Sequence, residues 1–66
     1  MVKYYLGQKV DRCLDDYADI WAPAKILDIS LVEQGGECVY VIGYFDDNWT
    51  KLESEENDVT AAEIRQ

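Results

Sequence analysis

The sequence predicts an all-β fold of five short strands and one C-terminal helical turn, closed as a small barrel. Residues 20–31 and 38–45 are almost continuous apolar runs, rich in β-branched and aromatic residues. Clusters of Asp, Asn and Gly lie on both sides of these runs. With 66 residues, 48% of them hydrophobic, and one Pro, the chain has the composition of a single folded domain over residues 1–66. A barrel is the most economical closure for five short strands at this length.

The first two strands are predicted on either side of an acidic turn. Lys9–Leu14 forms the first strand, and Asp15–Asp19 carries turn chemistry around one aromatic residue. Ile20–Leu31 forms a long second strand. Pro23 lacks a backbone donor, so it is expected at a sheet edge or a bulge. A helix over 22–32 is the rival interpretation, because short apolar runs are ambiguous by periodicity alone.

The β-prone run Cys38–Phe45 decides between these interpretations in favour of strands. Glu33–Glu37 contains the two glycines of a tight reversal, so the two runs are expected to pair as antiparallel neighbours. The sequence then predicts, in order, a turn, a short fourth strand, a solvated acidic loop, a brief fifth strand and a capping box with one helical turn. These segments are Asp46–Asn48, Trp49–Leu52, Glu53–Asp58, Val59 and Thr60–Glu63.

The predicted third strand is apolar on both faces. Side chains alternate along a strand, so Tyr40, Ile42 and Tyr44 share one face while Val39, Val41 and Phe45 share the other. Such a strand is either covered on both sides or uses one face as an interaction surface. The second strand supplies the other predicted core residues: Ala24, Ile26, Leu27 and Ile29.

The acidic balance of the chain bears on its partners. Fourteen Asp and Glu residues against six Lys and Arg give a net charge of −8. Nucleic-acid binding draws most of its affinity from Lys and Arg neutralising phosphates, so a nucleic acid is disfavoured and a basic protein partner is expected. The apolar runs are shorter than a membrane span, and Met1–Leu6 lacks the apolar core of a signal peptide. We therefore expect an intracellular protein with no membrane partner.

The residue types also bear on site chemistry. The chain contains no His and two Cys, too few ligands for a zinc site, and no Cys–His or Ser–His pair can form. Cys13 and Cys38 are expected as reduced thiols rather than a disulfide, in keeping with an intracellular location. The sequence predicts a protein that is not an enzyme, with no catalytic residues, metal site or cofactor.

Four segments in order resemble a known group of small barrels. They read GQKV, WAPAKI, YVIGYFDDNW and ENDVTAAEIR, and from Gly7 to Arg65 they are similar to the Tudor, Agenet and chromo-barrel superfamily. FDDNW is similar to the turn of the first Agenet/Tudor module in fragile X proteins and to the FDDGY turn of histone-reading Tudor domains, and VTAAEI to the closing turn of chromo-barrels. The resemblance implies a five-stranded Tudor-like (SH3-like) barrel with a C-terminal helical turn, acting as a chromatin reader in the nucleus.

The resemblance further implies an aromatic cage for methylated lysine or arginine at the open end of the barrel. Phe45, Asp47 and Trp49 fall on cage positions, with Tyr44 as the alternative if the register shifts by one residue. Rings stabilise an alkylammonium by about 0.5–2 kcal/mol each, and a carboxylate selects lower methylation states that keep an N–H donor. The alternative for these aromatic residues is ordinary packing across the barrel wall and its edge.

Two walls of such a cage are missing from the sequence. Related modules carry aromatic residues where this chain has Leu14 and Ala22. Tyr17 and Trp21 lie within a few residues of those positions and are candidate substitutes, although Trp21 also suits core or rim packing.

Three functions remain open at this point. The first is recognition of a basic peptide such as a histone tail, methylated or unmodified. The second is a protein–protein interaction scaffold for an unmodified partner, which uses a degenerate cage, an aromatic surface around Tyr4, Tyr5 and Tyr17, or an added strand. The third is an acidic inhibitor that imitates DNA in a basic cleft. The acidic run Glu53–Asp58 is either a solvated segment or a means of steering a basic ligand.

Overall fold

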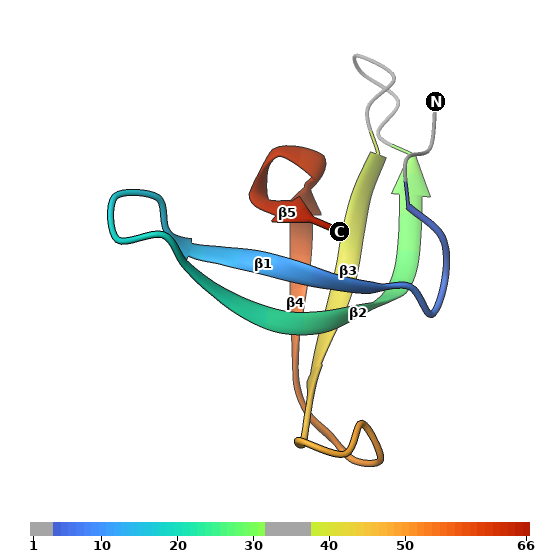
Figure 1. The fold of residues 1–66 in the computed structure, drawn as a ribbon. Helices are drawn as coiled ribbons and strands as arrows, with labels where there is room; N and C mark the ends of the chain where they lie inside the picture. Colours follow the sequence, from blue (N-terminus) through green and yellow to red (C-terminus); the bar gives the residue numbers. More distant parts are fainter. Residues whose placement is uncertain (1–3, 32–37) are drawn as a thin grey trace.

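The computed structural model describes residues 4–31 and 38–66, so the predicted reversal at 33–37 lies outside the described residues. Its regular structure is one antiparallel sheet in the order β4-β3-β2-β1-β5 (Figure 1). A three-residue 3₁₀ turn, η1 (Ala61–Glu63), joins the two outermost strands. The strands are β1 (Lys9–Asp15), β2 (Ile20–Leu31), β3 (Cys38–Phe45), β4 (Leu52–Thr60) and β5 (Ile64–Arg65). The predicted all-β class and five strands are confirmed.

The first three strands lie where the sequence predicts them. β2 and β3 begin and end at the predicted residues, and β1 extends one residue beyond Leu14. Residues 22–31 are not helical, because β2 pairs with both β1 and β3. Pro23 pairs with Asp11 of β1, and the ladder to β3 begins only at Lys25. Pro23 therefore lies where β2 has a neighbour on one side, as its missing donor requires.

The prediction was wrong for the fourth strand. Residues 53–58, predicted as a solvated loop, form most of β4, whereas residues 49–51 belong to the turn before it. Val59 ends up in the same strand rather than in a fifth. β4 is at the sheet edge, so Glu53, Glu55 and Asp58 remain exposed while its backbone pairs with β3; Glu56 is half-buried on the inner side. Two register shifts in this ladder, together with the acidic side chains, oppose the addition of a further strand.

The C-terminal capping box is confirmed, and the fifth strand follows it. Glu63 Oε1 accepts hydrogen bonds from the Thr60 backbone N–H at 3.2 Å and from the Thr60 hydroxyl at 3.0 Å. β5 then pairs with β1 through Arg12 and Ile64. Because η1 joins the outermost strands β4 and β5, the sheet bends strongly, and β1 and β2 cross in front of β3 and β4 in Figure 1.

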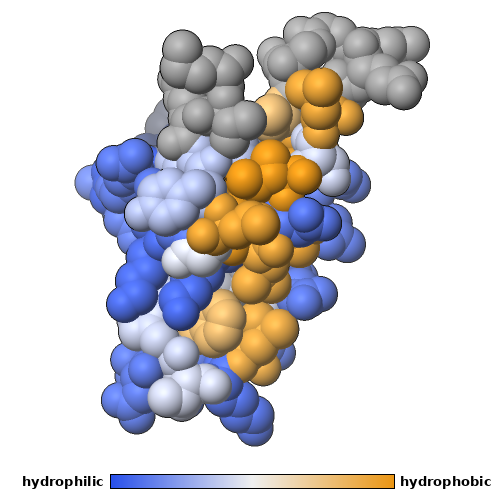
Figure 2. Space-filling model, turned by 90° about the vertical axis from the view of Figure 1, so that its right-hand side faces the viewer, coloured by the Kyte–Doolittle hydropathy of each residue, from blue (hydrophilic) through white to orange (hydrophobic). Residues whose placement is uncertain are grey.

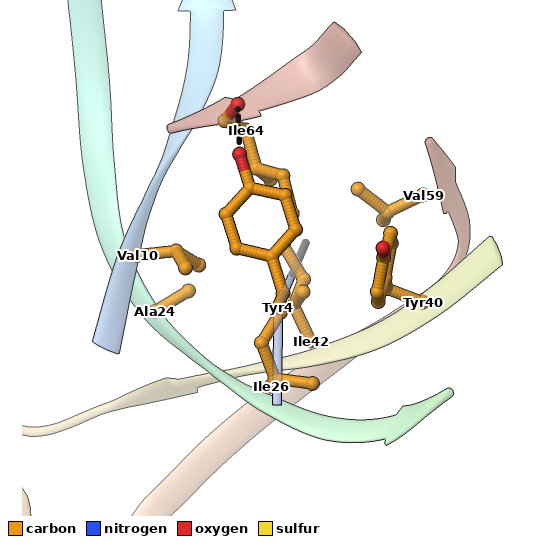
Figure 3. Packing of buried hydrophobic residues seen from close by; sticks show 8 residues of the cluster. All are labelled: Tyr4, Val10, Ala24, Ile26, Tyr40, Ile42, Val59 and Ile64. Carbon is orange, nitrogen blue, oxygen red and sulfur yellow. Dashed lines mark hydrogen bonds between the residues drawn. The ribbon is translucent and has the colours of Figure 1, made fainter. Parts of the chain in front are cut away.

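The core lies inside this bend, and the N-terminal segment packs into it (Figure 3). Gly7 N–H donates to Ile26 O at 2.8 Å and Ile26 N–H donates to Gln8 O at 2.9 Å, which fastens the segment to β2. Tyr4 is 8% exposed, packs edge-to-face on Tyr40 at 5.4 Å, and is hydrogen-bonded to β5. The buried cluster is Tyr4, Val10, Ala24, Ile26, Tyr40, Ile42, Val59 and Ile64. Tyr4 is therefore a core residue and not part of an exposed aromatic surface.

One predicted core residue of β2 lies on the opposite side of the sheet. Ala24 and Ile26 are fully buried, and Ile29 packs against the core. The ladder to β3 shifts at Leu27, between Ile26 and Asp28, which places Leu27 over Gly43 on the outer face. Alternation from the inward Ala24 and Ile26 places Leu27 on the outer face, so its prediction as a core residue was wrong. The bulge at Leu27 then returns Ile29, three residues after Ile26, to the inner face.

Candidate cation-binding site

The turn between β3 and β4 is fixed by Asp46. Its Oδ1 accepts the Thr50 N–H at 2.8 Å and the Lys51 N–H at 3.3 Å, and its Oδ2 accepts the Thr50 hydroxyl at 2.8 Å. These bonds, first from the Thr50 backbone and then from its side chain, lower the pKa of Asp46. The Trp49 N–H donates to Asp46 O at 3.0 Å, and Trp49 adopts a left-handed backbone with φ of 61°. The turn thereby sets the direction of the indole.

This turn brings together two of the predicted cage residues. The ring centres of Phe45 and Trp49 are 5.9 Å apart, and the planes are tilted by 37°. Both side chains are half-buried. Phe45 ends β3 on its outer face, because Tyr40 and Ile42 point inward and faces alternate along the strand. Asp47 lies exposed on the same turn.

The ammonium groups of two lysines of the same chain lie over these rings. The Lys25 ammonium lies 5.1 Å from the Phe45 ring centre and 5.5 Å from that of Trp49. The Lys9 ammonium lies 4.8 Å from the Trp49 ring centre. All three distances are within the roughly 6 Å over which a cation and an aromatic face attract each other. The Phe45–Trp49 pair therefore has the geometry of a cation-binding site, and the cations over it are the chain's own Lys9 and Lys25.

Sequence reasoning missed Lys9 and Lys25. They are cross-strand partners, and Lys25 also pairs with Gly43, two residues before Phe45. Knowledge of the β2–β3 register would have placed Lys25 beside the cage residues. That register depends on the connection between β2 and β3 and on the bulge at Leu27, and the β-propensity of the residues specifies neither of them.

Tyr44 faces the inside of the sheet and belongs to a different cluster. Its hydroxyl donates to Glu56 at 2.5 Å, and the Arg12 guanidinium binds Glu56 through two bonds of 2.8 and 3.2 Å. Arg12 also pairs with Glu63 at 2.8 Å. Burial, followed by the bond to Glu56, raises the pKa of Tyr44 to about 12. The bonds from Arg12 and then Tyr44 lower the pKa of Glu56.

Tyr17 and Trp21 lie at the β1–β2 turn, which projects away from the β3–β4 turn in Figure 1. Tyr17 is fully exposed. Trp21 donates its indole N–H to Asp19 at 2.7 Å and stacks under the Arg65 guanidinium at 3.8 Å. Trp21 shares an outward face with Lys25 but lies four residues, roughly 13 Å, farther along β2. These two aromatic residues do not join the Phe45–Trp49 pair.

The two missing walls of the predicted cage are not restored. Ala22 shares the inward face of β2 with the buried Ala24, whereas Phe45 points outward. Leu14 is 60% exposed at the far end of β1. The structure thus places Phe45 and Trp49 together and separates them from the other predicted aromatic residues.

A shallow recess of about 180 Å³ lies between β1 and η1, and its lining includes Arg12, Cys13 and Glu63. Cys13 and Cys38 are free thiols. The hydrogen bond from Cys13 Sγ to Asp16, at 3.0 Å, raises the pKa of this thiol and keeps it protonated. Across residues 4–31 and 38–66, no group of three or more side chains is arranged to hold a metal ion.

Comparisons of the chain with protein-family models, with curated proteins and with solved structures each found no match. In the described part of the chain there is no helix long and apolar enough to cross a membrane.

Proposed function

We propose that the protein is a non-catalytic recognition module of the Tudor-like, SH3-like barrel type, which binds a basic segment of a partner protein in the nucleus. The observation that carries the proposal is the pair of ammonium groups held over Phe45 and Trp49. A site that binds two lysine ammonium groups has the geometry to bind those of a ligand. The net charge of −8 favours a basic ligand and speeds its encounter.

The strand order supports the barrel part of this proposal. A four-strand meander, a 3₁₀ turn and a short last strand against the first bring both sheet edges to one corner. That is the most economical way to close five strands around a small core. The resemblance of the segments from Gly7 to Arg65 to reader modules is the reason for the nuclear assignment.

Methylation of the ligand is the feature that distinguishes the two leading functions. A trimethylammonium group is more weakly hydrated than a lysine ammonium, so it is better suited to displace Lys25 from the rings. A scaffold for unmodified partners has no such preference. Asp47 is exposed on the same turn, and a carboxylate that reaches the ligand would select lower methylation states that retain an N–H donor, so the monomethylated and trimethylated peptides are compared directly.

The test is a titration of isotope-labelled protein with one basic peptide that carries an unmodified, monomethylated or trimethylated lysine. We expect methyl-dependent shifts at the Phe45 ring and the Trp49 indole, together with a change at the Lys25 side chain. Equal shifts with all three peptides make the protein a scaffold for unmodified partners. No shift with any peptide rejects both functions.

Trp49→Ala should remove methyl-dependent binding, and Trp21→Ala is the matched control because Trp21 lies on the other hairpin. Each variant is first checked for retention of the native amide spectrum. If Trp49→Ala fails to fold, Phe45→Leu removes one face of the pair with a smaller change of volume. Unaltered binding by the folded variant would reject the ring pair as the site.

A further inference from the structure

The outer face of β3 is apolar and has no cover in the described part of the chain. Tyr40 and Ile42 are 2% and 0% exposed and point into the core, so Val39 and Val41 point to the opposite side. Both valines are only half-buried. The sequence left two options for this strand, a cover on both sides or one face used for interaction. The buried cluster lies on the inner side, and among residues 4–31 and 38–66 no second buried cluster covers the outer side, which favours the second option.

Two leucines make this face continuous. A Cβ placed on Gly43 would lie 2.7 Å from Leu27 Cδ1 and 2.7 Å from Leu52 Cδ1, so both leucines close over the glycine from the neighbouring strands. We call the resulting surface the outer β3 ridge; it consists of Leu27, Val39, Val41, Phe45 and Leu52. Apolar residues form a strip along the side of the molecule in Figure 2, with hydrophilic residues on both borders. Contiguous apolar surface of this kind marks a binding surface in a soluble protein.

The borders of the outer β3 ridge carry negative charge. Asp28 is the cross-strand partner of Val41 on the β2 side, and Glu55 is the partner of Gly43 on the β4 side. Both are exposed, and among residues 4–31 and 38–66 neither forms an ion pair. Lys25 and Lys9 lie at one end of the ridge and are directed at the rings. The charge that faces an occupant alongside Val41 is therefore negative.

This charge distribution argues against two other occupants. A second copy of the chain brings another net charge of −8 and places like charges at the borders of the same surface. A strand added to the β4 edge meets two register shifts, which divide the regular pairing of β4 into the short stretches 54–56 and 59–60. A basic segment that lies on the face, rather than on the edge, meets neither obstacle.

We propose that the outer β3 ridge is the docking surface for an extended basic segment of a partner protein. Alternate side chains of that segment are apolar and pack on Val39, Val41 and Leu27, while its lysines or arginines pair with Asp28 and Glu55. The inference rests on the proposed function for the basic character of the ligand. It adds a second requirement, that alternate side chains of the ligand are apolar. The segment ends near Phe45, so its last cation reaches the ring pair.

The test uses protein with labelled methyl groups and three acetylated, amidated octapeptides of alternating sequence. An alternating Lys–Val peptide should shift the methyl signals of Leu27, Val39, Val41 and Leu52. A Lys–Ser peptide of equal charge lacks the apolar contacts and should bind at least about tenfold more weakly. A Glu–Val peptide is repelled by the borders and should give no shifts. Equal affinity for the Lys–Val and Lys–Ser peptides overturns the inference.

Two matched pairs of variants locate the binding surface. Val41→Lys should weaken the Lys–Val peptide at least about tenfold, whereas Ile20→Lys adds the same charge at an exposed residue of β2 and should leave affinity unchanged. If Val41→Lys fails to fold, Leu52→Ser is compared with Leu14→Ser, since both residues are exposed in the native protein. Equal affinities within the folded pair reject the ridge.

The outcomes separate this inference from the proposed function. Shifts of the Phe45 and Trp49 rings, with no change in the methyl signals of Leu27, Val39, Val41 and Leu52, retain the cation site and reject the ridge. Shifts on the ridge without a response of the rings to a trimethyllysine peptide retain the ridge and reject the cation site. No binding of any basic peptide rejects both. Self-association seen by light scattering, with the same ridge methyls shifting as concentration rises, makes a second copy the occupant and rejects the inference.

Discussion

Arg12 of β1 and Glu56 of β4 form a two-bonded ion pair across the inside of the bent sheet, although β2 and β3 separate their strands in the sheet order. The two nitrogen–oxygen distances are 3.2 and 2.8 Å. The Arg12 side chain is 18% exposed and the Glu56 side chain 35% exposed, so water screens the pair only in part. The pair links the first strand to an edge strand and restrains the bend that the core requires.

Arg12→Met should lower the free energy of unfolding by about 1–3 kcal/mol, because it removes charge-assisted bonds and leaves Glu56 and Glu63 unpaired. Arg65→Met is the matched control. Arg65 pairs with Asp11 at 3.7 Å, and both side chains are about half exposed, so its loss should cost less than about 1 kcal/mol. Urea unfolding measures both changes. Equal losses would mean that the Arg12 pair does not restrain the bend.

Glu56→Gln should reduce the loss of stability in acid. Arg12 and Tyr44 lower the folded-state pKa of Glu56 below the unfolded value of about 4.3. The carboxylate therefore stabilises the fold above that unfolded value, and the stabilisation disappears as pH falls through the folded pKa. Free energies of unfolding measured below about pH 5 should fall less steeply in Glu56→Gln than in the wild type. The exposed Glu53→Gln on the same strand is the control, and identical slopes in all three proteins would contradict the prediction.

Tyr44→Phe should remove a loss of stability in alkali. The folded-state pKa of Tyr44 is raised to about 12, above the unfolded value of about 10. The neutral phenol contributes stability that is fully present below about pH 10 and is lost as pH rises towards 12. An absorbance difference titration between wild type and variant should show one phenol that ionises near pH 12. Tyr5→Phe, at a 67% exposed residue, is the control. A difference curve centred near pH 10 would contradict the prediction.

The strands that the sequence predicts correctly are those whose composition agrees with their environment. β2 and β3 combine apolar, β-branched runs with turn residues at both ends, and both strands contribute to the core. β4 is the opposite case. Its five acidic or amide side chains are typical of solvated loops, and only pairing with β3 makes it a strand. Propensity cannot identify an edge strand whose stabilising partner is another segment's backbone.

The candidate site was predictable only as far as local chemistry determines it. Phe45 and Trp49 are close in sequence, and the Asp46 turn places their rings together. The positions of Lys9 and Lys25 depend on cross-strand register, which bulges and turn lengths set. Tyr17 and Trp21 are candidates in the sequence because each lies within a few residues of a missing wall position, Leu14 or Ala22. They lie on a different hairpin because strand length, not sequence proximity, determines which turns meet.

The lysines over the ring pair act as intramolecular competitors of any ligand cation. A ligand gains access only in the fraction of molecules whose lysines have left the rings, and its apparent affinity falls by that fraction. Each contact is worth about 0.5–1 kcal/mol at a partly exposed site. Lys25 contacts both rings and Lys9 contacts one, so Lys25 is the stronger competitor.

Lys25→Gln should therefore tighten binding of a trimethyllysine peptide by about threefold to tenfold. Glutamine keeps most of the side-chain stem over Phe45 but removes the competing charge. Lys51→Gln is the matched control, because it makes the same charge change at an exposed residue of the turn between β3 and β4 whose ammonium does not lie over the rings, and it should alter affinity less than twofold. Titrations followed by Trp49 fluorescence measure both. Weaker binding of the peptide by Lys25→Gln would mean that this lysine contacts the ligand instead of competing with it. An equal gain of affinity in both variants would mean that the change in net charge alone causes the effect.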